Sequence, residues 1–418
     1  MNLDWLEVYA IEVEPRPWSF YHERGLEVQP RAYGTPMYRE MFTIMEHGAA
    51  LLEVRRDPYQ VRSQGGIFED GACHIRLCNR TCYYPDPVGV LRHFITEYGY
   101  EYKGISRLDI CLDFLKFDLG DDPLEILLSY MRGEISKINQ ANVAAHGQDQ
   151  WDGRYWNSLK WGSETSMVTT KLYNKTMELS RPGHDKFYIR DEWERCHLCS
   201  RQVTTYNYTN LDGETIQRYG LKYVPYGTAV SHPIPQDDVE EVQVWRVEFS
   251  VKSNAKHWVN MQTGDFYRLT LLQIDSRQKL IFLFHSLANH YFHFKTLTYT
   301  RDGKLQRKDR CPDKVLFRTS ASERAYKPAQ LPTADKQAPS WIMRVTDELR
   351  RLTTSPRVPE TIVNSAYYIL QQLWTDCRLA GAIRRDSEVF DLRVMSRSEL
   401  IQLYTKLRSM LEAKQLTF

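Results

Sequence analysis

Residues 106–114 read Ser-Arg-Leu-Asp-Ile-Cys-Leu-Asp-Phe, and this stretch decides the fold. Polar and apolar residues alternate, which is typical of a β-strand with one face on the hydrophobic core. Arg107, Asp109, Cys111 and Asp113 then share the other face. Two carboxylates on one face repel each other unless a positive charge lies between them. The stretch therefore indicates either a surface ion pair with Arg107 or a cation site, and oxygen ligands favour Mg²⁺ or Mn²⁺.

A second stretch, residues 245–251, reads Trp-Arg-Val-Glu-Phe-Ser-Val and repeats this pattern. Its alternation places Arg246, Glu248 and Ser250 on one face. An Arg-x-acid strand that occurs twice favours neighbouring strands whose carboxylates converge. We expect a metal site formed by Asp109 and Glu248, with Asp113 as a third ligand.

A third stretch, residues 171–178, reads Lys-Leu-Tyr-Asn-Lys-Thr-Met-Glu and follows the turn Gly-Ser-Glu-Thr-Ser at 162–166. A phenol ordinarily titrates at about 10, so Tyr173 needs help to become a nucleophile. The ammonium groups of Lys171 and Lys175 would favour the phenolate and would hold a phosphate. The alternative is an ordinary strand tyrosine between two solvated lysines.

The order of these motifs resembles a known family. Arg-x-Asp-x-x-x-Asp at 107–113 comes first, Gly-Ser-x-x-Ser at 162–166 with Tyr-Asn-Lys-x-x-Glu at 173–178 follows, and Arg-x-Glu at 246–248 comes last. This arrangement resembles the replication initiation factor (Rep-trans) family, which includes initiators of rolling-circle plasmids and relaxases of integrative conjugative elements. The resemblance covers residues from about 40 to 320.

The resemblance implies site-specific nicking and joining of a DNA strand. Tyr173 would attack a backbone phosphate and leave a 5′-phosphotyrosyl link with a free 3′-OH. Lys171 and Lys175 would neutralise the phosphate, and Glu178 would orient Lys175 or a neighbouring side chain. Asp109, Glu248 and Asp113 would hold Mg²⁺ or Mn²⁺, which would polarise the scissile phosphate. The side chains expected to contact DNA are Arg107, Arg246, Lys160, Ser163 and Ser166.

The chain also departs from the family. Lys171 stands where an arginine is frequent, and an insertion at about 180–240 follows the nucleophile directly. A conjugative-transfer relaxase would use the same chemistry and remains an alternative. A non-catalytic DNA-binding regulator on the same scaffold is a second alternative. DNA is the expected partner, as an origin or transfer-origin hairpin that is single-stranded at the nick. A host helicase and a second copy of the chain are candidate partners.

The pattern along the chain predicts an α+β fold in which helices flank a mostly antiparallel central sheet. It would be similar to the fold of nickases that bind metal through a His-hydrophobe-His pair, although none of the 12 histidines forms such a pair. The predicted domains are a catalytic domain at 1–325, a linker at 326–340 and an all-helical domain at 341–418. Several prolines predict that residues 1–40 are irregular. The Asp-Pro pairs at 86–87 and 122–123 predict helix starts, and residues 296–318 are strand-like.

Composition narrows the function only a little. The net charge of +2 neither requires nor excludes nucleic acid, although residues 301–310 hold five basic side chains. No apolar run is long enough to span a bilayer and no signal peptide is evident, so we expect a cytoplasmic protein with no membrane partner. Cys196 and Cys199 have the spacing of half a zinc site, but no second such pair exists and free thiols are favoured. The sequence contains no phosphate-binding Gly-Lys-Ser loop, so we do not expect ATPase activity.

Overall fold

The computed structural model describes residues 1–64, 67–138, 143–150, 153–163, 165–181, 186–210, 213–253, 257–260, 266–329 and 402. Residues Met1–Ala329 form one compact unit, and all described residues but one belong to it. The predicted helical domain at 341–418 and most of the predicted linker lie outside the described residues.

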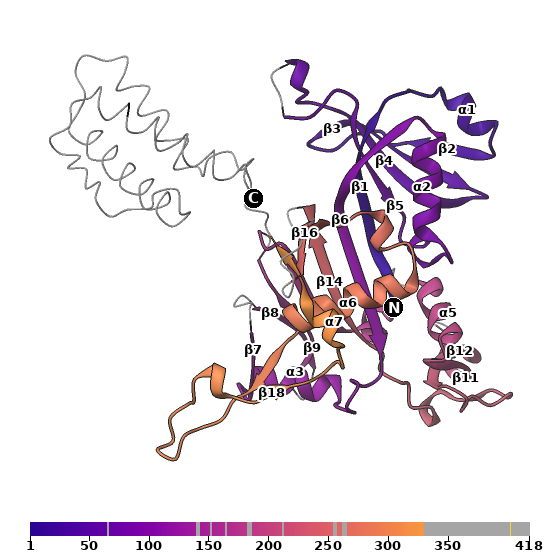
Figure 1. Cartoon of the computed structure of the whole chain (residues 1–418). Helices are drawn as coiled ribbons and strands as arrows, with labels where there is room; N and C mark the ends of the chain where they lie inside the picture. Colours follow the sequence, from indigo (N-terminus) through magenta and orange to yellow (C-terminus); the bar gives the residue numbers. More distant parts are fainter. Residues whose placement is uncertain are drawn as a thin grey trace, which may run out of the picture. The chain divides into compact units, whose positions relative to one another are not determined.

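The centre of the unit is a ten-stranded sheet in which every neighbouring pair is antiparallel, as the sequence predicts (Figure 1). Its strands, in spatial order, are β2 (Leu26–Pro30), β3 (Tyr38–Glu46), β4 (Ala49–Pro58), β5 (Ala72–Leu77), β1 (Asn2–Glu12), β6 (Tyr100–Phe114), β14 (Trp245–Lys252), β10 (Val168–Asn174), β9 (Gly153–Trp161) and β8 (Val143–Gln150). The strands that carry the three sequence motifs, β6, β14 and β10, are therefore adjacent.

Helices cover both faces of this sheet. The helices are α1 (Trp18–His22), α2 (Pro87–Glu97), α3 (Pro123–Met131), α4 (Lys175–Leu179), α5 (Phe187–Arg195), α6 (Arg277–Tyr291) and α7 (Ala321–Ala325). α6 and α2 lie on the apolar face, and α5 lies on the opposite face, where its Trp193 donates to Asp113 of β6. Figure 1 shows α6 running across β14 and β6, where the rings of Phe284 and Phe249 lie 5.1 Å apart. The ring of Phe94 in α2 stacks on Tyr100 of β6. Burial of these aromatic residues stabilises the layer, and the polar side chains of β6 and β14 are left on the opposite face.

Two of the helices begin where the sequence predicts. The side chain of Asp86 accepts a hydrogen bond from the backbone N–H of Gly89 at the start of α2. The side chain of Asp122 accepts one from Leu124 N–H at the start of α3. Each carboxylate satisfies a backbone donor that the first turn of a helix leaves free.

Three smaller sheets surround the central one. They are β12 (Thr215–Pro225), β11 (Cys199–Thr209) and β13 (Ile234–Pro235); β16 (Phe266–Arg268), β15 (His257–Asn260) and β19 (Tyr326–Ala329); and β18 (Asp313–Lys314), β17 (Phe294–Thr296) and β7 (Ile135–Lys137). The insertion expected at 180–240 contains α5 and the long β11–β12 hairpin.

Two sequence expectations are wrong. Residues 1–40 are not irregular, because β1 is an interior strand between β5 and β6 and the prolines at 15 and 17 lie just beyond its end. Leu6, Val8 and Ala10 of β1 are fully buried, and this alternation could have revealed the strand. Residues 296–318 are not a continuous strand either, because the only strands there are β18, which has two residues, and the last residue of β17.

Candidate active site

The registers of β6, β14 and β10 bring the predicted polar residues to one face of the sheet. Ser250 lies opposite Asp109 and Arg246 lies opposite Asp113 across the β14–β6 pair. Lys171 lies opposite Glu248 across the β10–β14 pair. Side chains directly opposite each other on antiparallel strands point to the same face. The expectation that the acidic strands are neighbours is confirmed.

Tyr173 lies between a carboxylate and an ammonium group. Its hydroxyl donates a hydrogen bond to Glu248 Oε2 at 3.0 Å, and Lys175 Nζ lies 3.4 Å from the same hydroxyl oxygen. Lys171 Nζ donates to the other oxygen of Glu248 at 2.8 Å. Burial, followed by the negative charge of Glu248, raises the pKa of Tyr173 well above its usual range. The resting phenol is therefore protonated, and Glu248 is placed to accept its proton.

Lys175 is buried at the point where strand becomes helix. It is the first residue of α4, whose start is capped by the Asn174 side chain, which accepts from Met177 N–H at 2.9 Å. Only 1% of the Lys175 side chain is exposed, and its ammonium donates to Glu178 at 2.7 Å. Burial and the nearby charge of Arg246 lower the pKa of Lys175. The predicted contact between Glu178 and Lys175 is present.

Asp109 is a buried carboxylate close to a second one. It accepts hydrogen bonds from Arg107 at 2.5 and 3.1 Å and from the hydroxyl of Ser250 at 2.5 Å. Desolvation by burial raises the pKa of Asp109 to about 6, and the charge of Glu248 adds to this shift. Asp109 and Glu248 are 2% and 3% exposed. Two buried like charges are unfavourable, and a divalent cation would relieve that repulsion.

Asp113 does not join Asp109 and Glu248. It lies four residues beyond Asp109 on one strand, which corresponds to about 13 Å between the Cα atoms. Its carboxylate accepts from Arg246 at 2.5 and 2.7 Å and from the indole of Trp193 at 2.8 Å. Burial alone would raise the pKa of Asp113, but Arg246 holds it below its usual value. Asp113 is thus a partner of Arg246, and its assignment as a third metal ligand is not retained.

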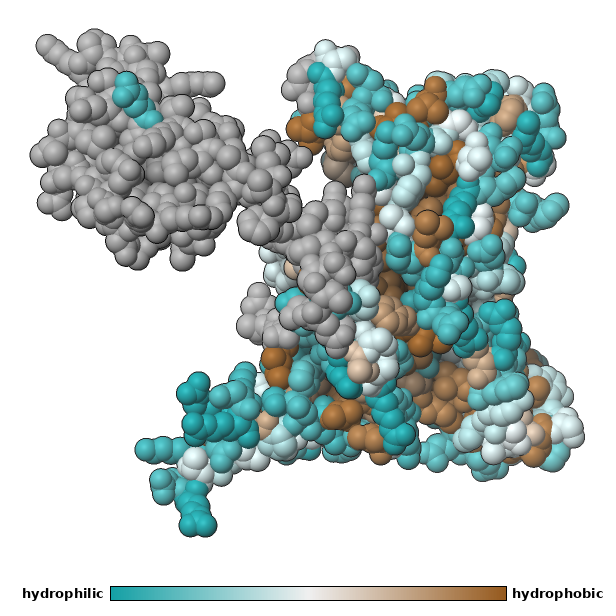
Figure 2. Space-filling model, in the orientation of Figure 1, coloured by the Kyte–Doolittle hydropathy of each residue, from teal (hydrophilic) through white to brown (hydrophobic). Residues whose placement is uncertain are grey.

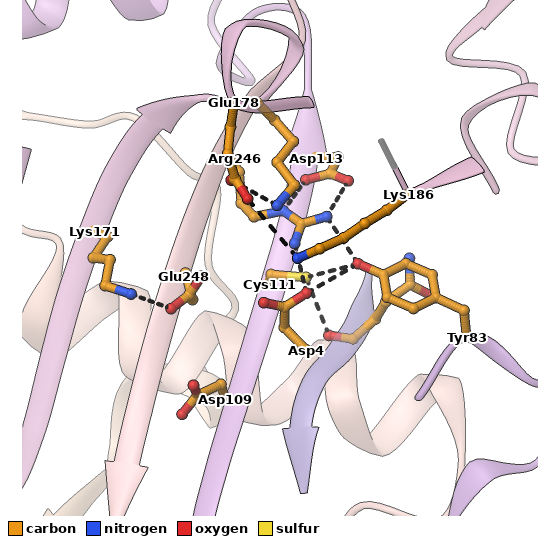
Figure 3. A network of polar contacts seen from close by, with 12 residues as sticks. Asp4, Tyr83, Asp109, Cys111, Asp113, Lys171, Glu178, Lys186, Arg246 and Glu248 are labelled. Carbon is orange, nitrogen blue, oxygen red and sulfur yellow. Dashed lines mark hydrogen bonds and ion pairs between the residues drawn. The ribbon is translucent and has the colours of Figure 1, made fainter. Parts of the chain in front are cut away.

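Arg246 is the centre of a buried network instead of a contact for DNA. Its side chain has no exposed surface, and it donates to Asp4 at 2.7 Å and to the Tyr83 hydroxyl at 2.9 Å as well as to Asp113 (Figure 3). Figure 3 shows this network beside the Lys171–Glu248 pair, with Asp109 on the far side of Glu248 from it. Because Arg246 cannot reach solvent, the expectation that it contacts DNA is wrong.

A cavity of about 430 Å³ opens over these residues. Seven of the sequence-predicted residues line it, namely Arg107, Asp109, Lys160, Lys171, Tyr173, Glu178 and Glu248. Ser163 and Ser166 do not line it; they hold the preceding turn together, because Ser166 Oγ accepts from Ser163 N–H at 2.9 Å. The turn thus shapes the β9–β10 connection.

Sequence analysis missed several polar or aromatic residues of the cavity wall, among them Asp4, Trp5, Asn79 and Arg181. Asp4 and Trp5 belong to β1, and a register shift between Leu3 and Trp5 accompanies their placement. The Trp5 ring receives the guanidinium groups of Arg107 and Arg76 at 4.3 and 4.2 Å from its centroid. Such cation–π contacts hold Arg107 beside Asp109.

The donor set fits a divalent ion held by two carboxylates. Among the described residues, no group of three His, Cys, Asp or Glu side chains could hold a metal ion. Mg²⁺ is commonly bound through one or two carboxylates, with waters and substrate phosphates completing the shell, so Asp109 and Glu248 satisfy its needs. A carboxylate has about four lone-pair sites, so Glu248, which accepts from Tyr173 at one oxygen and from Lys171 at the other, keeps lone pairs that a cation could use.

Cys196 and Cys199, which have the spacing of half a zinc site, lie elsewhere, as do two neighbouring histidines. Cys196 is exposed, with its thiol bonded to Glu192, while Cys199 is buried in β11. His293 pairs with Asp313 at 2.7 Å. The ring of His290 lies against Tyr291.

Comparisons with known proteins give little information about the family of this chain. No family model matches the chain, and no curated protein matches it. The chain is similar to the solved structure of a rolling circle replication initiator protein from Geobacillus stearothermophilus, with 13% identity and a TM-score of 0.41, over 75% of this chain and 92% of that one. None of the described helices has the length and apolarity needed to cross a membrane.

Proposed function

We propose that the chain nicks and rejoins a DNA strand through Tyr173. The observation that carries this proposal is the hydroxyl of Tyr173, a residue that lines the cavity: the hydroxyl oxygen lies 3.0 Å from a buried carboxylate and 3.4 Å from a buried ammonium. A nucleophile within hydrogen-bond reach of a base is the usual arrangement for covalent catalysis. Lys160, Lys171, Arg107 and Arg181 in the same wall suit a phosphate.

The proposed reaction exchanges one phosphodiester bond of the DNA for a phosphotyrosyl bond. The Tyr173 proton passes to Glu248 Oε2 while the phenolic oxygen attacks the scissile phosphorus. A Tyr–O–P bond forms and the P–O3′ bond breaks, which leaves a 5′-phosphotyrosyl link and a 3′-oxygen that takes up a proton. Lys175 stabilises the negative charge that develops on the phenolic oxygen. Attack of a 3′-OH on the phosphotyrosine reverses the step and rejoins the strand.

Asp109 and Glu248 would hold Mg²⁺ or Mn²⁺ in this proposal, while Lys171 and Arg107 keep the two carboxylates neutralised. When bound, the ion supplies Lewis-acid polarisation of the phosphate and stabilises charge on the leaving oxygen. Nicking of this kind starts rolling-circle replication of a plasmid or mobile element, which is the role that the resemblance of the motifs implies.

Incubation with an origin-bearing supercoiled plasmid and Mn²⁺ tests the proposal. Wild-type protein should give nicked circles and a covalent protein–DNA adduct, and chelator should suppress both. Tyr173→Phe should give no adduct while binding DNA. The matched control Tyr130→Phe removes a hydroxyl from a residue that packs on Trp161 outside the cavity, and it should form the adduct normally. An adduct formed by Tyr173→Phe would refute the assignment.

A further inference from the structure

A projecting segment of the chain, residues 297–312, carries a dense positive charge that the proposed chemistry does not use. We call it the basic arm. It leaves β17 and returns in β18, and it contains Arg301, Lys304, Arg307, Lys308 and Arg310 against two aspartates. All five basic residues are exposed. Figure 1 shows the arm as an orange loop beyond β18, and Figure 2 shows it as mostly hydrophilic.

The basic arm has a defined internal structure. Gln306 N–H donates to Thr298 O at 2.9 Å and Thr300 N–H donates to Lys304 O at 2.8 Å, so the arm folds back as a short hairpin. Gly303 at its turn has φ of 72°, a conformation that glycine adopts without strain. Cys311 is 2% exposed and anchors the returning segment in the protein interior. The charged side chains are therefore presented on a folded support.

Most of this charge is not neutralised within the protein. Arg307 faces Asp309 at 3.4 Å, but 77% and 63% of these side chains are exposed, so water screens the pair. Among the described residues, no carboxylate forms an ion pair with Arg301, Lys304 or Lys308. A compact group of like charges on a projecting hairpin repels itself and attracts a polyanion.

The base of the arm is fixed to the strands that carry the candidate active site, on the face of the sheet opposite the cavity. Phe294 of β17 packs its ring 5.7 Å from that of Trp161 in β9. Thr170 of β10 donates its hydroxyl hydrogen to the carbonyl of Tyr291, which lies three residues before Phe294. β9 and β10 carry Lys160 and Tyr173. A polyanion held by the arm is thus held by the same structural unit that holds the nucleophile.

We infer that the basic arm binds the phosphate backbone of duplex DNA that continues from the nicked segment; this inference rests on the proposed function and deepens it. We expect duplex rather than single-stranded DNA because the arm presents charged side chains and few aromatic ones. Binding of single strands commonly uses several aromatic side chains as stacking platforms, and the arm exposes only Tyr299. Contacts of lysine and arginine with phosphate position a protein on DNA without reading its sequence.

The test compares two full-length triple variants with the same loss of charge. The arm variant is Arg301→Gln, Lys304→Gln, Lys308→Gln. The control is Arg31→Gln, Arg39→Gln, Arg62→Gln, which alters exposed arginines around β2, β3 and β4 at the other end of the sheet. Thermal unfolding checks that both variants keep the fold. Equilibrium binding is then measured over a range of salt concentrations with a blunt duplex of random sequence and with vesicles of anionic lipid.

The arm variant should bind the duplex at least about tenfold more weakly than wild type, and the slope of log K against log salt should fall by about 2–3 because each lost phosphate contact removes about 0.9. The control should match wild type. Equal duplex binding by both variants would overturn the inference, as would a loss of vesicle binding alone. Binding to a duplex requires no nicking, so failure of the inference is distinct from failure of Tyr173 to form an adduct.

Discussion

Replacing Asp113 by Asn should destabilise the fold, although sequence patterning placed Asp113 in the metal site. The substitution removes the charge that two nitrogens of Arg246 contact at 2.5 and 2.7 Å. It also places the N–H donors of the new amide against the N–H donors of Arg246. Arg246 has no exposed surface, so water cannot compensate. Leaving one charge of a buried ion pair without its partner costs about 3–5 kcal/mol. Asp4 remains at 2.7 Å from Arg246, so we expect the lower end, about 3 kcal/mol.

Thermal unfolding measures this effect, with Asp109→Asn as the matched control on the same strand. For a unit of 329 residues, a loss of about 3 kcal/mol lowers the midpoint by about 4 °C. Asp109→Asn should change the free energy of unfolding by less than about 1 kcal/mol, because the Arg107 side chain is 41% exposed and regains water. It should nevertheless abolish nicking.

The contrast between the two variants decides the roles of the two carboxylates. An Asp113→Asn protein that unfolds at the wild-type midpoint but fails to nick would refute the structural role of Asp113. That result would return Asp113 to the reacting centre. An Asp109→Asn protein with full nicking activity would remove Asp109 from the candidate active site.

Three further predictions follow from the same geometry. Lys175→Met should slow adduct formation about 100-fold or more without lowering the unfolding midpoint, because burial of the ammonium is itself unfavourable; a wild-type rate would exclude Lys175 from the chemistry. Mn²⁺ should raise the unfolding midpoint of wild-type protein and not that of Glu248→Gln, since only a bound ion stabilises the folded state; equal shifts would place the ion elsewhere. Gly99→Ala should cost about 2 kcal/mol or more, because φ is 79° and a Cβ would lie 2.2 Å from Glu14 O, whereas Gly120→Ala, with open space around it, should cost about 1 kcal/mol.

Alternation along single strands predicted the polar face well. The sharing of one face by Arg107 and Asp109, and by Arg246 and Glu248, follows from the period of a strand and needs no tertiary information. The repeat of Arg-x-acid also predicted that β6 and β14 would be neighbours. These inferences were accurate because residues two apart on a strand point the same way wherever the strand lies.

Register could not be predicted in the same way. The pairing of β14 with β6 places Arg246 opposite Asp113. Asp113 is therefore the ion-pair partner of Arg246, whereas Asp109 remains a candidate metal ligand. A shift of the register would have given Arg246 a different partner. Asp4 and Trp5 were missed for a related reason, because β1 reaches the site only through long-range pairing between β5 and β6. The prolines that follow β1 obscured its own alternation.

The chain order of the three central strands has a consequence for the timing of activity during synthesis. β14 lies between β6 and β10 in the sheet, yet it follows β10 by 70 residues in the chain. Glu248, the base proposed for Tyr173, is therefore translated well after the nucleophile. A ribosome that stalls in the insertion releases a polypeptide whose tyrosine has no base and whose sheet is split. Under the proposed function, such an incomplete product lacks the proton acceptor for Tyr173 and therefore does not nick DNA.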